Sequence, residues 1–334
     1  MPNRKPIASL SLDLDNQWSY MKTHGDPAWE SYPSYLDIVV PRVLRFLDQR
    51  KLKITFFIVG TDAERPENAS ALASITASGH EVGNHSHRHE PWLHLYSNEE
   101  VEAEISRAEA AIAAVTGQRP SGFRGPGFSL SGPVLATLKK RGYRYDASTF
   151  PTFLGPLARA YYFFTAKLSQ EERQQRKGLF GGVREGLRPL RPYRWRLDEG
   201  PLLEIPVTTM PLFRVPFHVS YLLYLASFSP LVARLYFSSA ILLCRLTGVQ
   251  PSLLLHPLDF LGADDGLEPL KFFPGMDIPA ETKLSWISDF LAAYARHFQV
   301  LPLGAHVDAL TSTANLREVS PVFAHAAAGA TDVG

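Results

Sequence analysis

The chain alternates short apolar runs, typical of buried strands, with segments whose apolar residues recur every three to four positions, typical of helices. The predicted strands lie near residues 7–15, 53–59, 80–83, 121–124, 143–148, 252–256 and 299–303. The predicted helices lie near residues 35–50, 69–78, 98–116, 133–141 and 279–297. Strands that alternate with helices pair in parallel, so this order predicts an α/β fold built on a parallel sheet or barrel.

Acidic and histidine residues follow two of these strands. Asp13 and Asp15 end the first strand at period-two spacing, so their carboxylates point to the same side. Two like charges there cost free energy unless a cation or a shared proton lies between them. His85 follows the third strand and precedes His89 by four residues, which predicts both imidazoles on one side of a helical turn. Because the carboxyl ends of parallel strands meet, these residues predict a metal site; a solvated strand end and a surface histidine cluster are the alternatives.

Further strand ends carry polar residues. Arg124 lies in a Gly- and Pro-rich turn, where backbone N–H groups can face a ligand or where the arginine simply lies on the surface. Asp146 and Ser148 end a short strand. His256 ends an apolar strand, either as a hydrogen-bonded core histidine or as a catalytic group.

Composition limits the class of protein. With 334 residues and 45% hydrophobic content, the chain can bury a large core, and its formal charge of +1 excludes strong overall attraction to nucleic acid. Cys244 is the only cysteine, and residues 1–6 lead into the first strand without an apolar secretory segment, which favours the cytoplasm. We expect one α/β domain over residues 1–310 and a disordered tail over residues 311–334.

Two segments inside that domain fall outside the alternation. Residues 151–200 combine aromatic and basic residues, which suggests an insertion that meets an anionic, partly apolar partner. Residues 219–249 are apolar, but Pro230 and Arg234 interrupt them, so they lack the roughly 20 apolar residues of a membrane span. Either two helices packed on the barrel or a surface that faces a membrane or a lipid tail fits this segment.

Five motifs occur in a characteristic order: Ser11-Leu-Asp-Leu-Asp15, His85-Ser86-x-x-His89, Arg124-x-Pro126, Tyr145-Asp-Ala-Ser148 and Leu255-His256-Pro257. In this order they resemble the polysaccharide deacetylase family, also called NodB-homology or carbohydrate esterase 4-like. The resemblance covers residues 7–150 closely and residues 201–306 more loosely. It implies a distorted (β/α) barrel with about seven parallel strands, here with a helical insertion.

The resemblance also implies a metal site with a base beside it. Asp15, His85 and His89 would bind one divalent ion per chain, Zn²⁺ or another transition metal. Asp13 would be the general base that accepts a proton from the attacking water. Arg124 would pair with this base and orient it.

The remaining implied roles concern the leaving group and the substrate. His256 would be the general acid that protonates the departing amine, and the backbone N–H of Gly127 would stabilise the oxyanion. Ser86, Asp146 and Ser148 would contact the substrate.

Three departures from the family pattern leave questions open. Gly127 of the arginine motif stands where an aromatic residue is common in the family, so the wall of the substrate groove is unassigned. Leu14 separates the two acids, as in a subset that includes deformylases and other amide hydrolases beside sugar deacetylases. No Asp-Trp pair follows Ser148, so Asp146 and Glu204 are both candidates for the carboxylate partner of His256.

These inferences predict a metal-dependent hydrolase that removes an N-acyl group, most often acetyl, from an amino sugar of a glycan or a lipid-linked glycan precursor. Hydrolysis of a formamido sugar or a cyclic ureide on the same site is the alternative reaction, and a catalytically silent sugar-binding relative is the alternative class. The expected partners are the sugar substrate and the inner face of the membrane, as a peripheral contact. Homo-oligomerisation stays open, and no nucleic acid is expected.

Overall fold

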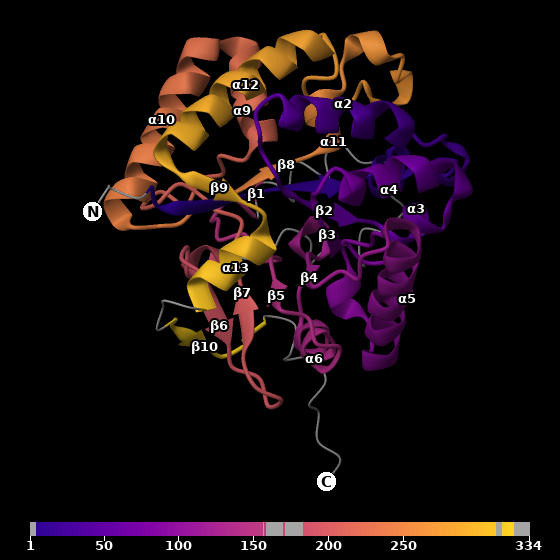
Figure 1. Ribbon diagram of the computed structural model, residues 1–334, viewed down its shortest axis with the longest axis vertical. Coiled ribbons are helices and arrows are strands. Elements are labelled where there is room, and N and C mark those ends of the chain that lie inside the picture. Colours follow the sequence, from indigo (N-terminus) through magenta and orange to yellow (C-terminus); the bar gives the residue numbers. More distant parts are fainter. Residues whose placement is uncertain (1–4, 156, 158–169, 171–182, 312–315, 324–334) are drawn as a thin grey trace.

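The computed structural model describes residues 5–155, 157, 170, 183–311 and 316–323. These residues form one curled sheet of ten strands with helices packed around it (Figure 1). Seven strands pair in parallel in the order β7-β5-β4-β3-β2-β1-β8. They are β1 Ile7–Leu14, β2 Thr55–Ile58, β3 Glu81–Asn84, β4 Gly122–Phe123, β5 Tyr145–Asp146, β7 Leu202–Glu204 and β8 Ser252–Leu255.

Three further strands lie at the margins of this parallel sheet. The strand β6 (Tyr193–Trp195) is antiparallel to β7, β10 (Glu318–Val319) is parallel to β6, and β9 (Gln299–Leu301) pairs with β1. The chain after β7 returns to β8, because the Thr208 N–H donates to the Ser252 carbonyl at 3.1 Å and the Ser252 N–H donates to the Thr208 hydroxyl at 2.8 Å. The curled sheet therefore closes on itself, and the predicted distorted barrel with about seven parallel strands is confirmed.

Amphipathic helices cover the outside of the barrel. The helix α2 (Leu36–Asp48) buries Val39, Val43 and Leu47 on one face, at the three- to four-residue spacing that predicted it. Ser97 caps the helix α5 (Asn98–Thr116) and forms a capping box with Glu100. Other α-helices among the described residues are α1 Gln17–His24, α3 Gly60–Glu64, α4 Ala69–Ala77, α6 Gly132–Lys140, α9 Val219–Phe228, α10 Pro230–Thr247, α11 Pro257–Phe260, α12 Ala280–His297 and α13 Leu303–Thr311.

The strand β1 is the centre of the fold. It lies between β2 and β8, and its side chains are buried on both faces from Ala8 onward, as a central parallel strand requires. Parallel register then brings the carboxyl ends of neighbouring strands together: the His85 N–H donates to the Ile58 carbonyl, and the Arg124 N–H donates to the Asn84 carbonyl. The residues that follow β1, β3 and β4 therefore meet at one edge.

Several segments differ from their predicted form. Residues 17–24, for which no helix was predicted, form α1, which Asn16 caps through its side chain. The sequence pattern gave no indication of β6, β7 or α13. The tail predicted as disordered from residue 311 contains β10; residues 312–315 and 324–334 lie outside the described part. Half of the insertion at 151–200, which was expected to be helical, also lies outside it.

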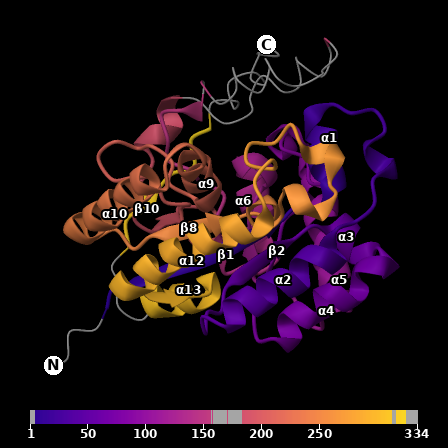
Figure 2. The ribbon, with the colours of Figure 1, turned by 90° about the horizontal axis from the view of Figure 1, so that it is seen from above.

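The apolar segment 219–249 forms the helix pair α9 and α10, one of its two predicted forms. The ring of Phe237 on α10 lies edge-on to Phe290 on α12, with centroids 5.4 Å apart. Figures 1 and 2 place α10 at the periphery of the molecule, on the side away from α5. The pair is thus packed on the barrel through one face only.

Candidate metal centre and active site

The loop that carries His85 and His89 is not helical. Ser86 and His89 both have left-handed backbone torsions, with φ of 61° and 52°, and these fold the chain back on itself. Such torsions are rare outside glycine and concentrate at functional sites. The predicted helical turn is therefore wrong, although its consequence holds: the two imidazole centroids lie 5.0 Å apart.

Hydrogen bonds from two other elements hold this loop. Glu104 on α5 accepts from the backbone N–H groups of His87 (3.0 Å) and Arg88 (2.9 Å) through one carboxylate oxygen. The Asn84 side chain accepts from the Ser86 N–H, and the Ser86 hydroxyl accepts from the His89 N–H. Ser86 thus shapes the turn, and its predicted contact with substrate stays a prediction.

Asp15, His85 and His89 converge as a candidate metal site. One potential ligand atom of each lies within 4.8 Å of the others, and all three residues are buried. Asp15 Oδ1 lies 2.9 Å from His89 Nε2 and 3.4 Å from His85 Nε2, yet it has no hydrogen-bond partner of acceptable geometry. An orphaned, buried carboxylate oxygen facing two imidazole nitrogens fits a divalent ion of the Zn²⁺ type.

The tautomer of His85 supports the same fit. Its Nδ1 lies 2.6 Å from the Arg124 carbonyl oxygen, which can only accept, so Nδ1 carries the proton and the Nε2 lone pair faces Asp15. Burial alone would raise the pKa of Asp15, but the charge of His89 and the contacts with both imidazoles outweigh it and hold that pKa well below its usual range. The carboxylate is therefore ionised, as a metal ligand must be.

The Arg124 guanidinium lies beneath this site and pairs with Asp13. Nη1 donates to Asp13 Oδ1 at 2.7 Å and to the Ser11 hydroxyl at 2.8 Å, while Nε donates to the Ala147 carbonyl at 2.9 Å. The Arg124 side chain is fully buried and lies over the Phe57 ring. The structure thus brings the expected base and its orienting arginine together at the end of β1.

His256 lies at the end of β8, where it precedes α11. Its Nδ1 is 3.1 Å from the Ser220 hydroxyl on α9, and its backbone N–H donates to the Asp259 carboxylate at 2.8 Å. Burial raises the pKa of Asp259, while the charge of His256 and a hydrogen bond from Ser220 act in the opposite direction. Ser220 therefore links the His256 ring to a buried carboxylate.

Neither Asp146 nor Glu204 is the partner of His256 that we expected. Asp146 accepts a hydrogen bond from Ser148, whose hydroxyl accepts from the Gly125 N–H. Glu204 accepts from Thr149 and from the indole N–H of Trp195. Burial and the adjacent Glu204 carboxylate raise the pKa of Asp146 well above its usual range.

The turn after β4 contains Gly127. Its φ is +57°, and a Cβ there would lie 3.1 Å from the Pro91 side chain. Glycine suits this position, because a side chain would be strained and crowded. Its predicted role at the oxyanion, like the predicted sugar contacts of Asp146 and Ser148, stays a prediction.

Residues in α1 and directly before α2 and α9 complete the site and were not identified from the sequence. The Tyr35 hydroxyl donates to the Asp15 carbonyl at 2.6 Å, and the Trp18 ring lies edge-on to His89 at 6.5 Å. The His218 ring lies 5.6 Å from that of His256, and burial together with the positive charges of His256 and Arg124 holds the pKa of His218 well below its usual value. A cluster of aromatic residues after Asp15 was the available signal for the first two.

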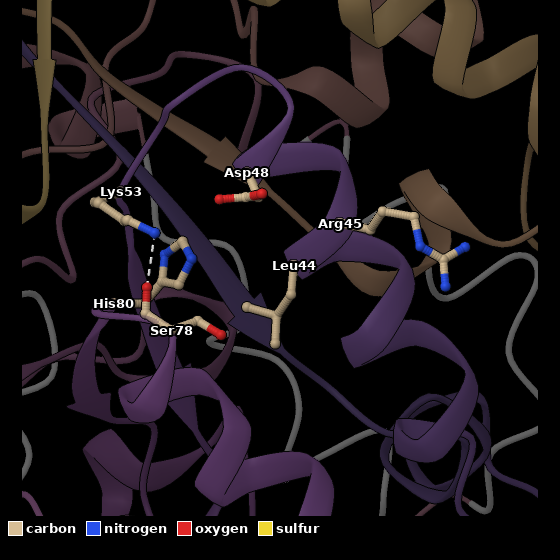
Figure 3. Close-up of a pocket in the computed structure, with 6 residues that line it drawn as sticks. All are labelled: Leu44, Arg45, Asp48, Lys53, Ser78 and His80. Atoms are coloured by element: carbon tan, nitrogen blue, oxygen red, sulfur yellow. Dashed lines mark hydrogen bonds between the residues drawn. The ribbon is translucent and has the colours of Figure 1, made fainter.

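A surface pocket at the opposite end of the barrel is separate from this site. Its lining residues are Leu44, Arg45, Asp48, Lys53, Ser78 and His80 (Figure 3). Lys53 and His80 precede β2 and β3, whereas the candidate site follows the carboxyl ends of the strands. In (β/α) barrels the carboxyl end carries the chemistry, so we assign no catalytic role to this pocket.

Comparison with known proteins extends these observations. Residues 30–145 match the family model of polysaccharide deacetylases. The chain is 28% identical over 208 residues to a peptidoglycan deacetylase of Helicobacter pylori, an alignment that covers 58% of this chain and 67% of that protein. It is 33% identical over 86 residues to a peptidoglycan-N-acetylglucosamine deacetylase of Bacillus cereus, covering 26% and 30% of the two chains.

A solved structure from Mycobacterium smegmatis, described as a polysaccharide deacetylase, superposes with a TM-score of 0.58 at 18% identity, covering 93% of this chain and 92% of that one. This likeness shows the shared fold. Fold and site together define a (β/α) barrel with a candidate metal centre at the carboxyl ends of its strands. Residues 30–145 thus carry a polysaccharide deacetylase domain.

Proposed function

We propose that the protein is a metal-dependent hydrolase that removes an acetyl group from the nitrogen of an amino sugar in a glycan. The observation that carries this proposal is the buried pair of Asp13 and Arg124 next to the converging Asp15, His85 and His89. A pure binding protein has no need of a fixed base beside a metal site. The names of the two relatives, both deacetylases of peptidoglycan, support an N-acetylated sugar as substrate.

The residues of the site have separate roles in the attack of water on the amide. When bound by Asp15, His85 and His89, a divalent ion would polarise the amide carbonyl and increase the acidity of water. Asp13, held by Arg124 through Oδ1, accepts the proton of the water that attacks the amide carbon. The Gly127 N–H faces the oxyanion that develops.

Cleavage of the carbon–nitrogen bond requires a proton on the leaving nitrogen. His256 donates this proton, so that acetate and the free amine of the sugar are released. Ser220 holds the His256 ring from the side of Nδ1, which leaves Nε2 as the atom that donates.

Assays on a panel of substrates test the proposal. The purified protein, supplied with Zn²⁺ or another divalent ion, should release acetate from N-acetylglucosamine oligomers, and Asp13→Asn should slow the release by roughly 10²–10⁴. Formate from a formamido sugar, or ammonia from a cyclic ureide, without any acetate would establish the alternative reaction. Sugar binding without any product would identify a silent relative.

We propose further that the glycan is a lipid-linked precursor and that the enzyme acts on it at the cytoplasmic face of the membrane. The buried, unpaired Cys244 agrees with a reducing compartment. Fractionation of cells should recover the protein with the cytoplasm and the inner face of the membrane. Recovery outside the cell would contradict this location and would leave the reaction itself untouched.

A further inference from the structure

The outer surface of α9, α10 and the hairpin before them is apolar. The hairpin turns at the bridge between Thr209 and Pro216, and the Tyr236 hydroxyl on α10 donates to the Pro216 carbonyl at 2.6 Å, which joins hairpin and helix. Large side chains that are 61 to 74% exposed extend over both elements. We call these residues the apolar face: Leu212, Phe213, Phe228, Leu231, Leu235 and Leu246.

The apolar residues of α10 lie on two opposite sides of the helix. Phe237 and Cys244 are buried against the protein, whereas Leu231, Leu235 and Leu246 are exposed and lie within about 60° of one another around the helix axis. A helix that only packs on a core is polar on its outer side. The exposed leucines therefore serve something other than the packing of this chain.

The packing of α10 excludes one way of using these residues. By length and composition α10 could cross a membrane: its 18 residues have a mean hydropathy of 1.2, and only 28% of them are buried. Its Phe237, however, packs between Phe290 and Tyr294 of α12. To cross a bilayer the helix would have to leave the barrel, whereas a helix lying in the plane of the lipid surface can keep these contacts.

Charge distinguishes a lipid surface from a second copy of the chain. From Ile205 to Leu258 the sequence contains no Asp or Glu, but it contains Arg214, Arg234 and Arg245. Arg234 pairs with Asp289 of α12, whereas Arg214 and Arg245 donate to backbone carbonyls and keep a net positive charge beside the face. Two copies joined through this face would bring like charges together, whereas anionic head groups complement them. Tyr221 and Tyr224 are also partly exposed beside the face, and tyrosine favours the boundary between lipid and water.

We propose that the apolar face docks the protein on the surface of a bilayer that contains anionic lipids. The docked surface leads to the active site, because the Tyr221 ring lies 4.5 Å from His218, which is 5.6 Å from His256. Docking brings the proposed acid close to the head groups, where a sugar on a lipid carrier is presented. This reading of the substrate rests on the proposed function; the docking itself does not.

Sedimentation with vesicles tests the docking on the whole chain. The protein should bind vesicles of phosphatidylcholine and phosphatidylglycerol, and less well vesicles of phosphatidylcholine alone. The double variant Leu231→Glu, Leu235→Glu should bind more than about tenfold more weakly, because a charged carboxylate replaces apolar surface that lipid would bury. Ile38→Glu, on the exposed side of α2, is the matched control and should bind like the wild type.

Two further measurements separate the outcomes. Acetate release from soluble N-acetylglucosamine oligomers should be the same in the double variant and the wild type. A wild-type protein that binds vesicles but releases no acetate would contradict the proposed function and leave the docking intact. Sedimentation velocity without lipid should show a monomer. A wild-type dimer that the double variant does not form would identify the apolar face as a contact between two copies and would overturn the proposal. Equal vesicle binding by the wild type and all variants would also overturn it.

Discussion

Arg124 Nη1 lies 2.7 Å from Asp13 Oδ1, and both side chains are buried at the end of β1. The guanidinium comes from the turn after β4, and two strands, β3 and β2, lie between β4 and β1 in the sheet order. The curl of the sheet brings the two partners together. A buried pair of this kind contributes less to stability than its geometry suggests, because both charges lose their hydration. Its retention here fits a base that must keep one orientation.

Removal of one partner should therefore destabilise the fold. Arg124→Met leaves the Asp13 carboxylate buried without its partner, which costs about 3–5 kcal/mol. Urea unfolding should show this loss in the free energy of unfolding. Combining Arg124→Met with Asp13→Asn should recover part of the loss, and strictly additive effects would show that the two side chains do not interact.

The two acids of the first motif should have different phenotypes. Asp13→Asn should retain metal and lose roughly 10²–10⁴ in rate, the usual contribution of a general base. Asp15→Asn should lose metal affinity, because Asp15 Oδ1 faces both imidazoles. Metal content by mass spectrometry, measured beside acetate release, separates the two variants. An exchange of the phenotypes would mean that the roles of ligand and base are reversed.

The sequence was enough to predict which residues come together at this site, but it did not predict the backbone conformation of the loop that holds the two histidines. Period-two spacing of Asp13 and Asp15 follows from strand geometry, and the strand order placed their partners at the same edge. Helical spacing predicted that His85 and His89 lie close together, but the loop that joins them is not helical. The left-handed torsion of Ser86 folds this loop, and hydrogen bonds to Asn84 and Glu104 hold it. Such torsions are set by tertiary contacts and leave no periodic signal.

The partner of His256 illustrates the same limit. We expected Asp146 or Glu204, which lie on strands that are neighbours in the sheet, but their carboxyl groups accept hydrogen bonds from Ser148 and Thr149. Ser220 reaches His256 from α9, in a segment that the resemblance covers only loosely. The segment is mostly apolar, so its composition does not indicate that Ser220 contacts His256.

Glu104 should act as a positioning residue for the metal ligands. Its carboxylate accepts two backbone N–H groups between His85 and His89, so Glu104→Gln weakens the anchor of the loop without touching a ligand. We expect metal affinity to fall by about 10–100-fold. Competition with a chromophoric chelator measures it. Glu109→Gln, on the same helix but paired with Arg119 and Arg141, should leave the affinity unchanged.

Ser220 should position His256. Ser220→Ala removes the hydroxyl 3.1 Å from His256 Nδ1, and the loss of one hydrogen bond of about 1–1.5 kcal/mol corresponds to roughly a tenfold fall in kcat. KM should stay constant, because no substrate contact is removed. Ser220→Thr keeps the hydroxyl and should restore most of the rate. A rise in KM with unchanged kcat would instead place Ser220 against the substrate.

Buried histidines away from the site should make the fold sensitive to acid. Burial lowers the pKa of His306 to about 4, and its Nε2 and Nδ1 are occupied by Gln250 and Ser9. In the unfolded chain a histidine has a pKa near 6.5. Between pH 6.5 and 4 the His306 imidazole is therefore protonated in the unfolded state and neutral in the folded state. The free energy of unfolding should therefore fall as the pH falls through this window, by up to about 3 kcal/mol from His306. Urea unfolding at a series of pH values measures how steeply the free energy of unfolding changes with pH. His306→Gln should reduce this slope. A lower stability of the variant at pH 8, where the wild-type histidine is neutral in both states, would not affect that comparison. An unchanged slope would show that His306 takes up its proton in the folded protein.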